Sequence, residues 1–60
     1  MSKITFIRVA MGMYNLNLGA AKRLADRVWR AMGFFPTQYC PEDQVTLMAT
    51  HARNEYRAMT

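Results

Sequence analysis

Apolar residues recur at helical spacing in three segments of the chain, separated by two short stretches of turn-forming residues. An interval of three or four positions places side chains on one face of an α-helix. The breaks fall at residues 15–19, with two asparagines and a glycine, and at 33–41, with a glycine and two prolines. The pattern predicts an all-α fold: a helical hairpin formed by residues 2–14 and 18–32, then a third helix over residues 41–59 that comes after an aromatic loop.

The first segment is compatible with two secondary structures. Its apolar residues form two stripes at helical spacing, one with Ile4, Ile7, Met11 and Tyr14 and the other with Phe6, Val9 and Met13. The alternative is a β-strand over residues 3–9, which are rich in β-branched and aromatic side chains. Strand alternation would place Arg8 on the same side as Ile4 and Phe6, so a helix is favoured. A helix that is apolar on much of its circumference is central to a fold or part of an interface.

The second segment has the clearest amphipathic pattern. Asn17 is a favourable N-cap and Gly33 a favourable C-terminal stop. One face holds Leu18, Ala21, Leu24, Ala25, Val28 and Met32, with Trp29 at its edge. The other face holds Lys22, Arg23, Asp26, Arg27 and Arg30. Since Asp26 lies four positions from both Lys22 and Arg30, we expect it to pair with one of them.

The third segment opens at Pro41, a residue suited to the first position of a helix. Glu42 and Asp43 come next, where the helix dipole favours carboxylates. The apolar face then comprises Val45, Met48, Ala49, Ala52, Tyr56 and Met59. The loop before Pro41 contains Phe34, Phe35 and Tyr39. Either Phe34 and Tyr39 fold over the end of the core, or the loop exposes an aromatic patch that anchors a partner.

The size of the chain limits what it can do alone. Its 60 residues form one domain at most, and a domain this small is only marginally stable. The one cysteine, Cys40, rules out a disulfide within the chain, and with His51 it provides two of the four ligands that structural zinc requires. We therefore expect no metal or other cofactor, and stabilisation by self-association or by a larger partner. A lone thiol is typical of the reducing cytoplasm.

Catalytic groups are sparse. A helix N-terminus can lower the pKa of a thiol such as Cys40, but His51, its only possible base, would lie about 15 Å away along a straight helix. No glycine-rich phosphate loop is present, and no apolar stretch approaches the roughly 20 residues that span a bilayer. The chain is therefore predicted to be non-enzymatic, with no small-molecule substrate and no membrane span.

The positive charge is concentrated in the first half of the chain. The net charge is +4, and residues 1–33 hold six of the eight basic residues but one of the four acidic ones. Arg23, Arg27 and Arg30 form a basic stripe. This stripe is either a solvated helix face, a contact for nucleic acid or a contact for an acidic protein. It lacks interleaved aromatic residues that would stack on bases, and arginine is well suited to protein interfaces.

Residues 3–10 (KITFIRVA) and 15–22 (NLNLGAAK) resemble the first helix and the next turn in the C-terminal domain of the bacterial ribosomal stalk protein. Residues 23–26 match the segment after that turn, and residues 40–43 match the start of that family's third helix. The turn and its lysines contact translation factors in that family. The resemblance implies that Arg8 and Lys22 are basic contacts to a partner.

Taken together, these features predict a small non-enzymatic binding protein that docks on a larger protein or on itself. Small accessory or inhibitory proteins, including those of bacteriophages, have this size and composition, and a viral origin would place the chain in the host cytoplasm. The apolar contacts are predicted at Phe6, Met13, Trp29, Phe34 and Phe35. Arg23, Arg27 and Arg30 would steer association. The alternative is a sequence-nonspecific nucleic-acid-binding protein that uses the same arginines.

Overall fold

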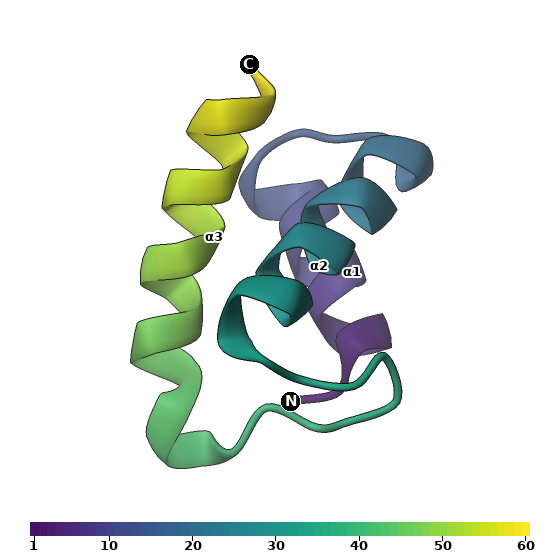
Figure 1. Cartoon of the computed structure of the whole chain (residues 1–60). Helices are drawn as coiled ribbons and strands as arrows, with labels where there is room; N and C mark the ends of the chain where they lie inside the picture. Colours follow the sequence, from purple (N-terminus) through teal and green to yellow (C-terminus); the bar gives the residue numbers. More distant parts are fainter.

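The computed structural model describes all 60 residues and contains three α-helices and no strands. The elements are α1 (Lys3–Met13), α2 (Leu18–Met32), a short 3-10 helix η1 (Glu42–Gln44) and α3 (Val45–Met59). The all-α prediction is confirmed, and residues 3–9 are helical. In Figure 1, α2 runs antiparallel to both α1 and α3.

Local side-chain chemistry sets the bounds of the first two helices. The Ser2 hydroxyl accepts a hydrogen bond from the Thr5 amide at 3.1 Å, and the Asn17 side-chain oxygen accepts one from the Ala20 amide at 2.8 Å. Gly33 ends α2 in the left-handed conformation, with φ of 74°, which glycine adopts without a steric penalty. Ser2 and Asn17 are therefore the N-caps of α1 and α2, the second as predicted.

The third helix differs from its prediction at the start. Pro41 has extended backbone angles and precedes η1, so the α-helix begins at Val45 rather than at Pro41. The Gln44 amide donates to the Pro41 carbonyl at 2.9 Å, which closes a tight 3-10 turn. Such turns are frequent at helix N-termini, and η1 thereby joins the extended loop to α3.

Only α2 packs closely against both other helices. The α1–α2 and α2–α3 pairs make extensive backbone contacts, whereas α1 and α3 make none. The chain therefore forms two helix pairs that share α2, and the third side of the bundle, between α1 and α3, is open.

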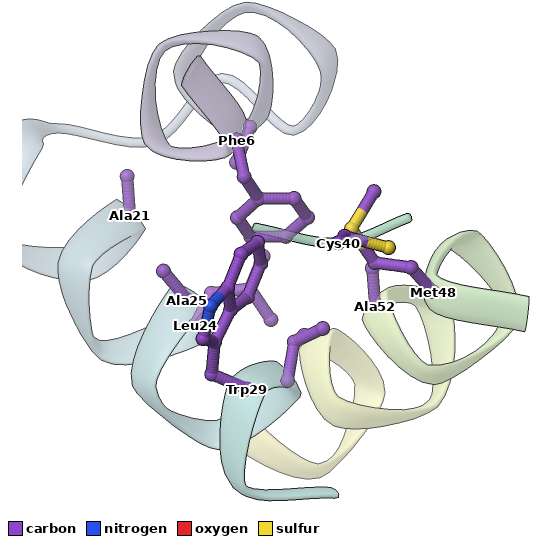
Figure 2. Close-up of a cluster of buried hydrophobic side chains, with 10 residues drawn as sticks. Phe6, Ala21, Leu24, Ala25, Trp29, Cys40, Met48 and Ala52 are labelled. Carbon is purple, nitrogen blue, oxygen red and sulfur yellow. The ribbon is translucent and has the colours of Figure 1, made fainter. Parts of the chain in front are cut away.

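The core lies around the buried stripe of α2 (Figure 2). Its ten buried residues are Phe6 and Ala10 from α1, Ala21, Leu24, Ala25, Val28 and Trp29 from α2, Cys40 from the loop, and Met48 and Ala52 from α3. Four of these ten are alanines, and their small side chains let the helices approach closely. The buried stripe is opposite the charged positions of α2, as the sequence predicts.

Trp29 ties α1, α2 and the aromatic loop together. Its ring centre lies 5.4 Å from that of Phe6 and 5.8 Å from that of Phe34. The indole N–H donates to the Gln38 carbonyl at 2.8 Å, so the polar atom of this buried ring is satisfied. Aromatic pairs at these separations contribute about 1 kcal/mol beyond the area they bury.

Two further contacts join segments that are distant in the sequence, one near each end of the bundle. The amino group of Met1 donates to the Cys40 carbonyl at 2.7 Å, and the Cys40 amide donates to the Met1 carbonyl at 2.8 Å. Near the other end, the rings of Tyr14 and Tyr56 stack with centres 4.5 Å apart. No helix has both the length and the apolar character needed to cross a bilayer.

The packing predicts a large difference between two leucines of α2. Leu24 is fully buried, whereas Leu18 is half exposed. We expect Leu24→Ala to lower the free energy of unfolding by about 2–5 kcal/mol, and Leu18→Ala by about 1 kcal/mol or less. Chemical denaturation followed by circular dichroism measures both values. Equal losses would contradict the assignment of Leu24 to the core.

Candidate docking surfaces

The exposed side of α2 carries a concentration of positive charge. We call Lys22, Arg23, Arg27 and Arg30 the basic face, and all four are exposed. Asp26 lies among them and is also exposed. Because these positions are opposite the buried stripe, α2 supplies both the core and this charged surface.

Ion pairs with residues of α1 and α3 change the charge pattern of this surface. Asp26 pairs with Lys3 of α1, rather than with Lys22 or Arg30 as expected. Glu55 of α3, which lies one turn after His51, pairs with Arg27 at 2.8 Å. Exposed pairs of this kind contribute at most about 1 kcal/mol each. Their main consequence is that Lys22, Arg23 and Arg30 are the basic-face cations without an ion-pair partner.

Two surface hollows connect the basic face to the aromatic loop, which comprises residues 34–39. The larger, of about 490 Å³, is lined by Arg23, Asp26, Arg27, Arg30 and Met59. The smaller, of about 230 Å³, is lined by Lys3, Asp26, Trp29, Arg30, Phe34 and Pro36. Asp26 and Arg30 line both hollows, so the charged and aromatic surfaces are contiguous.

The aromatic loop holds one phenylalanine at the core and presents another to solvent. Phe34 is half-buried against Trp29, whereas Phe35 is 76% exposed. The Gln38 side chain accepts a hydrogen bond from the Phe35 amide at 3.2 Å, and the Gln38 amide donates to the Phe35 carbonyl at 3.0 Å. Tyr39 is also exposed. Phe34 therefore covers the core as one alternative predicted, while Tyr39 does not.

Two of the predicted contact residues are core residues. Phe6 is 4% exposed and Trp29 is 2% exposed, because their rings pack against each other between α1 and α2. Each ring can offer a partner only the small part that lines a hollow, Trp29 in the smaller hollow beside the basic face and Phe6 in a groove between α1 and α3. The prediction that they are docking contacts is corrected to that extent, because both belong mainly to the core. Arg8 is exposed on α1 but lines none of the hollows around the basic face.

A second surface, the apolar groove, lies between α1 and α3. Ten apolar residues line it and it has a volume of about 130 Å³. Val9, Ala10 and Met13 contribute from α1, and Val45 and Ala49 contribute from α3. Met13, a predicted contact residue, is 69% exposed at its edge. Both walls are apolar faces predicted from the sequence, the second stripe of α1 and the apolar face of α3, but the sequence did not indicate that an open groove lies between them.

Cys40 is a buried thiol close to the amino terminus. Its sulfur lies 3.6 Å from the Pro41 carbonyl, to which the thiol donates. Burial raises the pKa of the Cys40 thiol; the positive amino terminus opposes this shift and Asp43 adds to it. The helix start therefore does not produce the low-pKa thiol that a cysteine nucleophile needs.

The raised pKa of Cys40 predicts how stability depends on pH. Above about pH 8.5 the thiol ionises in the unfolded chain but retains its proton in the folded chain. The free energy of unfolding of the wild type should therefore fall as pH rises through this range. Between pH 7 and pH 10, the free energy of unfolding of the Cys40→Ala variant should fall less than that of the wild type. Urea unfolding at both pH values measures the difference. An identical decrease in the free energy of unfolding of both proteins would show that the Cys40 thiol does not contribute to the pH dependence.

Comparisons with known proteins found no match for the chain among protein-family models, curated proteins or solved structures. The resemblance to the ribosomal stalk family is accordingly neither supported nor refuted.

Proposed function

We propose that the chain is a non-enzymatic binding protein that docks on an acidic surface of a larger protein. Phe35 of the aromatic loop is the apolar anchor, and Arg23, Arg27 and Arg30 of the basic face supply the positive charge. The observation that supports the proposal is the continuity of the two hollows through Asp26 and Arg30: the smaller hollow is lined by Phe34 and Pro36, the chain neighbours of the exposed Phe35. Aromatic residues and arginine are the residue types that most often dominate binding energy at protein interfaces.

The carboxylates within this surface favour a protein partner over nucleic acid. The basic face and Lys3 together supply five cations, and Asp26 and Glu55, which pair with Lys3 and Arg27, add two carboxylates. Asp26 sits in the middle of the basic stripe and would repel a phosphate backbone that runs along α2. A protein surface with acidic and polar groups can complement both signs of charge. The surface therefore fits a mixed, mainly acidic protein patch better than a uniform row of phosphates.

The charge distribution also predicts how the partner is approached. The basic face, Lys3 and the carboxylates Asp26 and Glu55 together carry a net charge of +3 out of the +4 of the chain. Charge gathered on one side orients the molecule during diffusion and accelerates encounter with an oppositely charged surface. Association should therefore slow as salt concentration rises, while the desolvated Phe35 contact controls dissociation.

Matched charge variants test the proposal. Immobilised protein captures partners from nuclease-treated lysate, and mass spectrometry identifies them; each purified partner is then titrated against the variants by calorimetry. Arg23→Gln with Arg30→Gln should weaken binding about tenfold or more, and Phe35→Ala about thirtyfold. Arg53→Gln with Arg57→Gln removes the same charge from α3 and should change affinity less than twofold. Ile4→Ala is the control for removal of an exposed apolar side chain.

The outcomes distinguish the candidate functions. Equal losses from the two arginine pairs would show that only net charge matters and would contradict a defined docking surface. Fluorescence anisotropy with a short DNA duplex measures the nucleic-acid alternative directly. Affinity that depends on Arg23 and Arg30, with a log–log salt slope of about −0.9 per phosphate contacted, would favour that alternative over the protein partner.

A further inference from the structure

The apolar groove and the basic face lie on opposite sides of the molecule. The buried stripe of α2 faces the core, and its charged positions point the other way. The groove is lined by residues of α1 and α3 together with Met1, and no residue of α2 reaches it. Its opening is therefore on the side of the bundle away from α2. A partner held in the groove does not cover the basic face.

The charge pattern determines which partner the groove can accept. Every residue that lines the groove is apolar, so nothing in it attracts an acidic protein or a phosphate. A second copy of this chain carries the same net charge of +4 and would be repelled from the basic face. Contact through the groove face keeps the two basic faces far apart on the outside. This is the approach that brings two copies together with the least like-charge repulsion.

The shape of the groove fits a side chain rather than a long helix. Its volume of about 130 Å³ is close to the roughly 150 Å³ of an apolar cavity that holds one benzene molecule. The hydrogen bonds between Met1 and Cys40 lie near one end of the bundle, and the stacked rings of Tyr14 and Tyr56 lie near the other. A docked amphipathic helix would need space for three or four anchors along its face.

The same face also provides a side chain to fill the hollow. Met13 lines the groove and is nevertheless 69% exposed, so most of its side chain is accessible to a second copy. A hollow and a projecting side chain on one surface make that surface self-complementary, as a two-fold interface between identical chains requires. Methionine is flexible enough to fit an irregular apolar cavity.

We propose that the apolar groove is a homodimer interface in which Met13 of each copy enters the groove of the other, between α1 and α3. The groove occupies only part of a face that extends 26 by 19 Å, so the interface is small. Stable complexes bury about 800 Å² per partner. The dimer is therefore weak and reversible, with its basic faces outward, and it does not depend on the proposed acidic partner.

Sedimentation equilibrium between about 20 µM and 1 mM tests the dimer with two matched variants of the full chain. Met13→Glu and Ile4→Glu add the same charge to α1 at positions with nearly equal exposure, 69% and 67%. Wild type should show a reversible monomer–dimer equilibrium. Met13→Glu should raise the dimer dissociation constant at least tenfold, and Ile4→Glu less than twofold. A wild-type chain that stays monomeric at 1 mM, or equal effects of the two variants, would overturn the proposal.

A groove-filling variant and a salt series provide independent measurements. Ala49→Phe places a ring in the groove and should abolish the dimer without loss of helical circular dichroism; a dimer as strong as that of wild type would overturn the proposal. Raising sodium chloride from 50 to 500 mM should leave the dimer unchanged or strengthen it, because the basic faces repel less. Dimer dissociation at high salt would contradict an apolar interface. Salt weakens docking on an acidic partner, so failure of either proposal is recognised separately.

Discussion

The structure depends on one packing constraint: the backbone of α2 lies close to both other helices, whereas no Cα atom of α1 lies within 8 Å of one in α3. The buried stripe of α2 supplies five of the ten core residues, and Trp29 extends that core to α1 and to the aromatic loop. Because α1 and α3 meet only through side chains such as Tyr14 and Tyr56, a gap lined by apolar residues is left between them. The open third side of the bundle is thus a direct consequence of how α2 packs.

The same constraint separates charge from apolar surface. A helix that buries one face between two neighbours can expose only its opposite face, and in α2 that face carries Lys22, Arg23, Arg27 and Arg30. The groove therefore lies on one side of the molecule and the basic face on the other, with the aromatic loop beside the basic face. Two surfaces of different chemistry allow a chain of 60 residues to make two kinds of contact at once. Self-association on one side would leave the other side free to bind.

The sequence predicted what local chemistry determines and missed what depends on distances between helices. The bounds of α2 were predictable because Asn17 and Gly33 act within one turn of the chain. The start of α3 was not, because Cys40 pairs with Met1 and the chain enters α3 through a 3-10 turn. The burial of Phe6 was not predicted because α1 is apolar on two stripes, and periodicity alone does not show which members of a stripe are buried. Ion pairs such as Arg27 with Glu55 and the groove itself arise only from tertiary packing.

Native-state hydrogen exchange measures the central role of α2 most directly. Amides of core elements exchange only through global unfolding, whereas less buried elements exchange through smaller openings. If α2 holds the bundle together, the amides of Leu24, Ala25 and Val28 should exchange with the free energy of global unfolding, and those within α1 and α3 with lower values. Amides of α1 or α3 that are protected as strongly as those of α2, or more strongly, would contradict this account.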